Sequence, residues 1–245
     1  MNAPRRWTPD AVRAQSRRLE ESSPQAVLRW ARGAFERVAQ GTGFGPSGVV
    51  IMHMLARQAA PGERDGLTFF FLDTGVLFEE TYALRERLEA RLGVHVRAVE
   101  PRISLREQAN VCGEALWDRA PDQCCHIRKV RPLKRFLRGQ DAWVTGVRRD
   151  QSETRRETKR LEWDETHAVA KVNPLATWTR EQVWAYINRH DLPYNPLHDR
   201  GYPSIGCRPC TEPAAAAAGD DEEENARAGR WNGHEKTECG LHLAE

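Results

Sequence analysis

The sequence predicts an α/β protein with a doubly wound, mostly parallel sheet, and three features lead to this fold class. Short apolar segments alternate along the chain with amphipathic segments of helical length. The run LTFFFLD is continuously apolar and rich in aromatic residues, which is typical of a strand buried on both faces. The glycine-rich turn GTGFGPSG leads directly into an apolar helix, so we expect a ligand to bind at the strand ends.

The first two helices are predicted from their capping residues. Thr8–Pro9 and Ser23–Pro24 each combine an N-cap residue with a proline at the first helical position. The apolar stripe of the second helix is predicted to comprise Val27, Trp30, Phe35 and Val38. A third, apolar helix follows the glycine-rich turn and is expected to end near APGERDG.

Further strands and helices are predicted to alternate after this point. LTFFFLD, VHVRAVE and AWVTGV are predicted strands, and helices are predicted over 79–92 and about 104–119. A basic helix follows the double cysteine, with an inward face made of Ile127, Val130, Leu133 and Leu137. The polar segment 148–165 is predicted to be a surface loop. Thr179 and Gln182 form a capping-box pattern before a last short helix.

The composition changes abruptly after Pro213, where AAAAAGDDEEENARAG begins. Such a stretch contains too few apolar residues to form a packed core of its own. We therefore predict an α/β domain over residues 1–213 and a flexible C-terminal tail over 214–245.

The overall charge limits the classes of partner. The 245 residues carry a formal net charge of +2, so neither nucleic acid nor a membrane surface is an expected partner, and a homo-oligomer is compatible with this balance. The chain shows no apolar signal segment at its start and no stretch of membrane-spanning length, so we expect a cytoplasmic protein. Cytoplasmic thiols stay reduced, and the six cysteines are therefore expected to act as metal ligands or catalysts.

Four of the cysteines form two pairs, Cys124 with Cys125 and Cys207 with Cys210. A structural zinc site is one interpretation, because four cysteines commonly bind zinc. Adjacent cysteines, however, are cramped on one tetrahedral ion, whereas each can ligate a different iron of a cubane. The pairing therefore favours a 4Fe–4S cluster.

The other two cysteines differ in their surroundings. Cys112 lies among apolar residues of a predicted helix, where core packing is the simplest role. Cys239 lies in the predicted tail, close to Lys236 and His242. A terminal cysteine is more often incidental than catalytic, but an exposed thiol on a moving segment beside basic groups also describes a delivered nucleophile.

Five motifs together give a resemblance to a known family. CCHIRKVRPL, AWVTGVRRDQSETR, IGCRPCT, RAGRW and KTECGLH occur in the order found in the thioredoxin-dependent adenylyl-sulfate (APS) reductases of bacterial sulfate assimilation. The resemblance implies a fold like that of the pyrophosphatase-loop ATP enzymes. It also implies that Cys239 attacks the sulfate sulfur of adenosine 5'-phosphosulfate, giving an enzyme S-sulfocysteine and AMP, and that thioredoxin then releases sulfite.

The resemblance also implies roles for individual residues. Lys129 matches a lysine between the 4Fe–4S cluster and the substrate, and that cluster is expected to tune electrostatics without cycling its redox state. LDTG places Leu72 where backbone groups meet adenine, while the glycine-rich turn departs from the SFSGAE pattern of many relatives and Pro121 replaces a frequent histidine. The implied substrate contacts are Thr42, Gly45, Leu72, Gly146, Arg156, Arg227 and Arg230.

Three alternatives remain open at this point. An enzyme of this family could reduce the 3'-phosphorylated substrate (PAPS) or both nucleotides, although dedicated PAPS reductases generally lack the cluster cysteines. An adenylating RNA thiolase would need an SGGxDS loop, which GFGPSG is not. A metal-stabilised nucleotide sensor would leave Cys239 and its tail unexplained.

Overall fold

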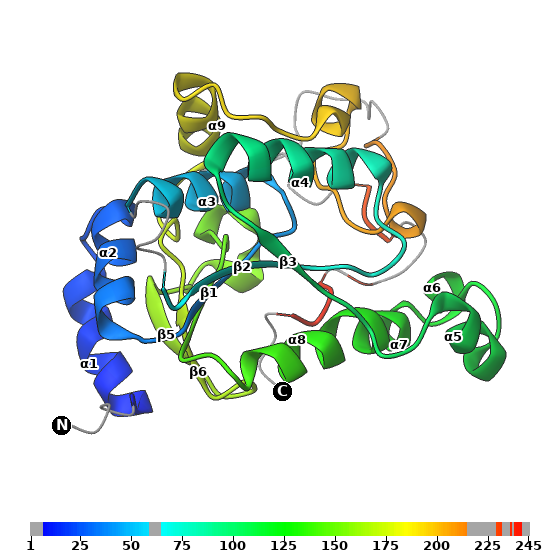
Figure 1. Cartoon of the computed structure of the whole chain (residues 1–245), viewed down its shortest axis with the longest axis horizontal. Coiled ribbons are helices and arrows are strands. Elements are labelled where there is room, and N and C mark those ends of the chain that lie inside the picture. The colour runs from blue at the N-terminus through cyan, green and yellow to red at the C-terminus, as the bar shows by residue number, and fades with distance from the viewer. Residues whose placement is uncertain (1–6, 59–64, 215–228, 232–235, 237, 242–245) are drawn as a thin grey trace.

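The computed structural model describes residues 7–58, 65–214, 229–231, 236 and 238–241 (Figure 1). Its centre is a six-stranded sheet with the strand order β3-β2-β1-β4-β6-β5. All neighbouring strands are parallel except β5, which runs antiparallel to β6. The strands are β1 (Val38–Gly41), β2 (Leu67–Leu72), β3 (Val96–Val99), β4 (Ala142–Val144), β5 (Leu161–Asp164) and β6 (Val169–Val172).

Helices cover both faces of this sheet, so the predicted fold class is confirmed (Figure 1). The helices are α1 (Pro9–Leu19), α2 (Pro24–Ala34), α3 (Pro46–Gln58), α4 (Glu79–Leu92), α5 (Leu105–Cys112), α6 (Leu116–Arg119), α7 (Pro121–Cys125), α8 (Arg131–Leu137) and α9 (Arg180–Arg189). A π-helical turn, His126–Val130, joins α7 to α8. Short 3₁₀ turns lie at Arg149–Gln151, Glu153–Arg155, Pro196–Arg200 and Arg208–Cys210.

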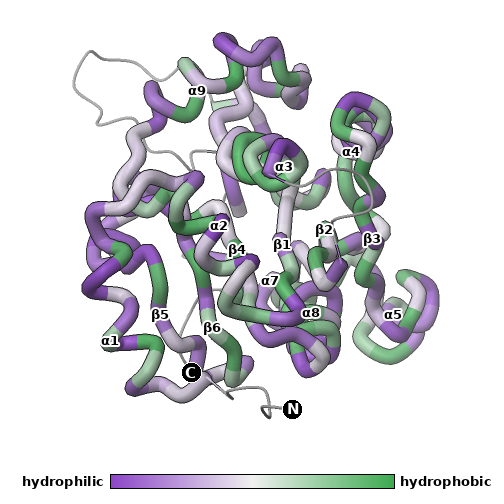
Figure 2. The backbone as a smooth tube through the Cα atoms, turned by 60° about the vertical axis from the view of Figure 1, so that its left-hand side comes forward, coloured by the Kyte–Doolittle hydropathy of each residue, from purple (hydrophilic) through white to green (hydrophobic). Residues whose placement is uncertain are grey.

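Successive strand residues point to opposite faces of the sheet and so divide the core in two. Phe69 and Phe71 pack in the larger apolar cluster with α2, α3, α4 and α9, whereas Phe70 packs with Leu133 and Leu137 of α8. Figure 2 shows the hydrophobic stretches on the central strands and on α3. The central strands are therefore buried on both faces, as LTFFFLD predicts.

The order of the strands creates a crevice at the carboxyl ends of the central strands β1 and β4. The chain moves from β1 outward to β2 and β3, then returns to place β4 on the other side of β1. The loops after β1 and β4 consequently diverge, and ligands of open α/β sheets bind at such a switch point.

Several predicted elements agree with the structure at their boundaries. The Thr8 and Ser23 side chains accept hydrogen bonds from the backbone amides of Ala11 and Ala26, as N-caps do. Helix α4 covers the predicted residues, and both hydrogen bonds of the Thr179–Gln182 capping box are present.

Other predictions are wrong, and each has a local reason. Helix α2 ends at Ala34, and Val38 begins a strand instead of continuing the helical stripe. Residues 148–165 are not only a surface loop, because they contain β5 and three buried arginines, Arg148, Arg155 and Arg160. The helix predicted over 104–119 is broken at Gly113, whose φ of +80° ends α5.

The remaining expectations concern single features. Cys112 is half-buried instead of lying in the core. No helix among the described residues is long and apolar enough to cross a bilayer. The described residues of the predicted tail pack against the α/β domain: an isolated antiparallel bridge joins Arg230 to Thr211, and Leu241 packs against the cluster under α8.

Candidate active site

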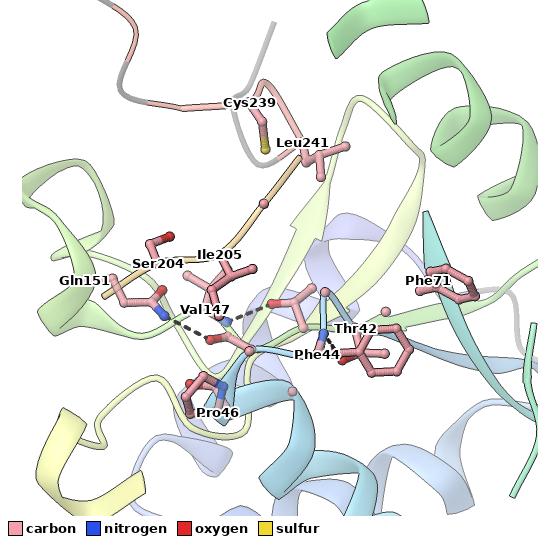
Figure 3. Close-up of a pocket in the computed structure, with 18 of the residues that line it drawn as sticks. Thr42, Phe44, Pro46, Phe71, Val147, Gln151, Ser204, Ile205, Cys239 and Leu241 are labelled. Atoms are coloured by element: carbon pink, nitrogen blue, oxygen red, sulfur yellow. Dashed lines mark hydrogen bonds between the residues drawn. The ribbon is translucent and has the colours of Figure 1, made fainter. Parts of the chain in front are cut away.

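A cavity of about 350 Å³ opens at the switch point between β1 and β4 (Figure 3). Pockets of this size hold small molecules and cofactors. Its walls come from the loop after β1, the ends of β2 and β4, the segment before the CxxC pair, and the C-terminal segment. The predicted site residues that line it are Thr42, Gly45, Leu72, Lys129, Gly146, Arg230 and Cys239.

The glycine-rich loop after β1 forms the sheet end of the cavity. The Phe44 amide donates to Thr42 Oγ1 at 2.9 Å, and the Phe44 ring is buried at 5.3 Å from the Phe71 ring (Figure 3). Phe44 has a φ of +58°, an uncommon conformation for a residue with a side chain. The buried ring and the Thr42 hydrogen bond therefore hold the loop in one shape before α3 begins, where backbone amides can meet an anion.

The loop after β4 forms the adjoining wall and approaches the first loop closely. A Cβ atom on Gly146 would lie 3.1 Å from Ser47 Cβ, so this position suits glycine. Gln151 Nε2 donates to the Gly146 carbonyl at 3.4 Å (Figure 3). The buried Arg148 guanidinium donates to Ser47 Oγ at 2.5 Å and pairs with Asp150 at 2.9 Å. These contacts fix the two loops relative to each other.

Arg156 was predicted to contact the substrate, but its neighbour Arg155 is the one that lies in the cavity wall. Arg156 does not line the cavity: its side chain is 70% exposed and pairs with Glu153 at 2.6 Å. Arg155 lines the cavity instead and is buried, since the 3₁₀ turn Glu153–Arg155 directs it inward. Arg227, the other predicted anion contact, lies outside the described residues.

The four paired cysteines lie in one region near Lys129, which lines the cavity. Burial raises the pKa of Cys124, raises that of Cys125 to about 11 and raises that of Cys210 to about 12. The charges of Cys207, Cys125 and Cys124 add to the rise at Cys210, so all four thiols lie within one region. Thiolates at Cys124, Cys125 and Cys210 therefore form only where positive charge lies close by.

Polar groups around these thiols are also ordered. Thr74 Oγ1 lies 3.3 Å from Cys207 Sγ, and Gln108 Nε2 donates to Cys124 Sγ at 3.9 Å. Arg128 is buried and donates to the Thr74 carbonyl and to Gln108 Oε1, so it holds both groups in place. Within the described ranges, no three His, Cys, Asp or Glu side chains are arranged to hold a metal ion.

Lys129 connects the thiols to the cavity. It lies in the π-helical turn, a rare geometry that is frequent at functional sites. Burial lowers its pKa, but the charges of Cys207, Cys239 and Cys125 outweigh burial and hold the pKa above the ordinary lysine value. Lys129 therefore carries its positive charge into the cavity.

The C-terminal segment completes the site. Figure 3 shows the Cys239 sulfur directed toward the side where Ile205 and Thr42 lie, and Leu241 lies next to it. The Arg230 guanidinium lies 4.3 Å from the buried Trp231 ring and donates to Ser204 Oγ at 3.2 Å. Among the described residues, five cationic side chains line the cavity: Lys129, Arg148, Arg155, Arg180 and Arg230.

Sequence reasoning missed Arg148, Arg155 and the acidic residue Glu238, which pairs with Arg155 at 2.9 Å. No local pattern separates these arginines from their neighbours, the half-buried Arg149 and the exposed Arg156. The one available signal is their place within a few residues of AWVTG, since loops that follow central strands meet at the switch point.

The fold and cavity define the class of protein: an α/β protein with a cationic cavity at its switch point and a cysteine in the lining of that cavity. The phosphoadenosine phosphosulfate reductase domain model matches residues 37–213. The chain therefore belongs to this family.

Individual relatives agree with this membership. A protein of Salinibacter ruber named adenosine 5'-phosphosulfate reductase is 52% identical over 97% of this chain and 91% of its own length. A Gloeobacter violaceus protein named phosphoadenosine 5'-phosphosulfate reductase is 45% identical over 93% of this chain and 91% of its own. The structure is similar to a phosphoadenylyl-sulfate reductase of Candida auris in a phosphate complex, with a TM-score of 0.73, 33% identity, and coverage of 84% and 98% of the two chains. The FMN adenylyltransferase of Candida glabrata, at 14% identity and a TM-score of 0.55 over 85% and 67% of the chains, shares the fold alone.

Proposed function

We propose that this protein reduces adenosine 5'-phosphosulfate to sulfite and AMP by covalent catalysis at Cys239. The observation that carries the proposal is that Cys239 lines a cationic cavity that lies at the switch point of a nucleotide-type fold. Relatives named for this reaction, including the Salinibacter ruber protein, support the choice of substrate.

In the first half of the reaction, the Cys239 thiolate attacks the sulfur of the phosphosulfate. A bond forms between Cys239 Sγ and that sulfur, and the bond from sulfur to the bridging oxygen breaks. AMP leaves with the electron pair on its phosphate oxygen. Lys129 and the cavity arginines stabilise the charge that develops on the leaving group, since fixed cations in a cavity act more strongly than in water.

In the second half, a dithiol protein such as thioredoxin regenerates the enzyme. One of its thiolates attacks Cys239 Sγ, and sulfite leaves with the electron pair of the S–S bond. The second thiol then resolves the mixed disulfide, so the reductant is oxidised by two electrons and Cys239 returns as a thiol.

The paired cysteines Cys124, Cys125, Cys207 and Cys210 would hold a 4Fe–4S cluster. Their chemistry suits it, because four cysteine sulfurs are the usual ligands of such a cluster and these four lie within one region. The polar contacts to Cys207 and Cys124 are of the kind that tunes such clusters. When bound, the cluster would supply electrostatic tuning beside Lys129.

A single turnover separates the two halves of the reaction. Anaerobically purified protein is mixed with adenosine 5'-phosphosulfate without a reductant, and AMP is measured. We expect at most one equivalent of AMP per active chain and the mass of a sulfonate on the peptide that contains Cys239. Reduced thioredoxin should then release sulfite. Continued AMP release without a reductant would contradict the proposal.

The metal content is measured on the same preparation. We expect about four irons per chain with matching acid-labile sulfide. Stoichiometric zinc without sulfide would exclude the cluster, and serine substitution of any of the four cysteines should remove iron and turnover together.

A second candidate substrate is phosphoadenosine phosphosulfate, favoured by the names of the Gloeobacter violaceus and Candida auris relatives. Sulfite release is therefore assayed with both nucleotides at equal concentration. A larger kcat/KM for the 3'-phosphorylated nucleotide would reverse the assignment of substrate.

A further inference from the structure

Two ion pairs attach the segment that precedes Cys239, and they differ in exposure. The Lys236 ammonium pairs with Asp122, whose side chain is 85% exposed. The Glu238 carboxylate pairs with Arg155 Nη2 at 2.9 Å, and these side chains are only 7% and 9% exposed. The second pair is therefore shielded from solvent on both sides.

This difference predicts which pair holds the segment. An ion pair whose carboxylate is open to water contributes less, because water and salt screen it. In the Lys236–Asp122 pair only Asp122 is open to water, since the Lys236 side chain is 7% exposed. Separating a buried pair costs much more, since a charge is left without its partner in a medium of low polarity. Arg155 is also fixed from its own side, where Nη1 donates to Gln151 Oε1 at 2.5 Å.

The Glu238 contact constrains the position of the reactive thiol directly. Glu238 and Cys239 are consecutive, so their Cα atoms are about 3.8 Å apart. On the other side of Cys239, Leu241 packs in the apolar cluster under α8. Figure 1 shows this red segment of the chain beside α8. Cys239 is thus held between a buried ion pair and an apolar contact.

We propose that Glu238 is a positioning residue that holds the Cys239 thiol at the cavity through its ion pair with Arg155. Its effect on catalysis rests on the proposed function, whereas its effect on the docking of the segment does not. The attack on substrate needs the docked segment, and reaction with a protein reductant needs the segment released. Loss of the pair should therefore slow the first half of the reaction and leave the second half intact.

Docking is measured without substrate by proteolysis. Lys236 is the only lysine after Lys171, so a lysine-specific endoprotease cleaves the tail at this one site. The Lys236 side chain is 7% exposed in the docked segment, and cleavage therefore requires release. We expect the full-length Glu238→Gln variant to be cleaved about tenfold faster than the wild type. Synthetic peptides that span Lys236, with Glu or Gln at position 238, correct for the intrinsic preference of the protease.

Two matched variants make this measurement specific. Asp122→Asn removes the pair whose carboxylate is open to solvent and should accelerate cleavage by less than about twofold. Glu157→Gln removes an exposed carboxylate elsewhere and should have no effect. Wild-type cleavage rates for Glu238→Gln, or equal acceleration by Asp122→Asn, would overturn the proposal.

A double-mutant cycle tests the partner. Arg155→Gln should release the segment as Glu238→Gln does, and the double variant should be cleaved no faster than either single variant. Additive acceleration would show that the two residues act independently and would overturn the pairing. If Arg155→Gln does not fold, the comparison of Glu238→Gln with Asp122→Asn decides, because Glu238 lies on the terminal segment.

The catalytic readout uses single turnovers. Glu238→Gln should lower the rate of AMP formation about tenfold, in proportion to the loss of docking. The discharge of preformed S-sulfo-enzyme by reduced thioredoxin should not fall. An equal loss in both halves would contradict a positioning role. If the wild type forms no AMP, the proposed function fails, and the proteolysis still tests the ion pair.

Discussion

The two ends of the cavity are built in different ways. The sheet end consists of two short loops, 41–48 and 145–148, that follow adjacent parallel strands. The thiol end brings together Lys129, Arg230 and Cys239, which are more than one hundred residues apart at their extremes. The sheet end is thus defined by backbone topology, whereas the thiol end depends on individual side chains that only the tertiary fold brings together.

This difference predicts unequal responses to substitution. Backbone groups survive the change of a side chain, provided that the loop keeps its shape. A thiol or an ammonium group, in contrast, is lost entirely when its side chain is replaced. Substitutions at the thiol end should therefore affect turnover more than substitutions at the sheet end, and the following predictions run from the largest expected effect to the smallest.

Cys239→Ser should reduce sulfite production by about a thousandfold or more, because the variant lacks the attacking sulfur. Nucleotide binding, measured by equilibrium dialysis, should persist, and so should iron content, since the tail supplies none of the proposed ligands. Sustained sulfite production would show that another residue is the nucleophile, with Cys112 the next to test.

Lys129→Ala should lower kcat about a hundredfold, because the cavity loses a fixed positive charge next to the leaving group. The thermal midpoint should change little. Lys134→Ala is the matched control, since Lys134 is an exposed lysine of the following helix. Equal losses in both variants would assign the effect to the overall charge of this region.

Gly206→Ala should raise KM about tenfold with a small change in stability. A Cβ atom at this position would lie 2.3 Å from Arg230 Nη2, so the guanidinium must move away from its place. Gly33→Ala, where no atom lies within 4 Å, is the control and should leave KM unchanged. An unchanged KM in Gly206→Ala would show that Arg230 does not contribute to binding from this position.

Arg156→Gln should change KM and kcat by less than about twofold, since its exposed ion pair with Glu153 is of the weak kind. Arg155→Gln should raise KM markedly, because Arg155 is buried at the cavity wall. Both variants are compared by steady-state kinetics. A larger loss of kcat/KM in Arg156→Gln than in Arg155→Gln would contradict the assignment of Arg155 to the cavity wall.

The parts of the fold that the sequence predicts are those with a local cause. Ser23 and Thr179 are recognised because an N-cap and its partners lie within one helical turn. Strand β1 was not predicted, because its sequence VAQG contains a glutamine and a glycine, which are not typical of a buried strand. It forms a strand because it pairs with β2 and β4. Strands β5 and β6 likewise depend on their partners in the sheet.

The same distinction applies to the site. The thiol pairs and the glycine-rich turn are contiguous motifs, so their residues could be named from the sequence. Arg148 and Arg155 are buried by contacts with Ser47 and Glu238, which are far from them in the sequence. No spacing of residues along the chain predicts such contacts. Tertiary contacts therefore decide which of two adjacent arginines faces the cavity.

The π-helical turn at His126–Val130 has a consequence for how this protein can vary in length. Each residue of a regular α-helix turns the chain by about 100° and advances it by about 1.5 Å, and a π-helical turn accommodates one extra residue within such a helix. Deleting one residue here would let the helix become regular, and the flanking segments, with Cys124 and Cys125 on one side and α8 on the other, would keep nearly the same relative orientation. A homologue can therefore be one residue shorter in this segment without turning its paired cysteines away from α8, provided that the residue lost is neither Arg128 nor Lys129.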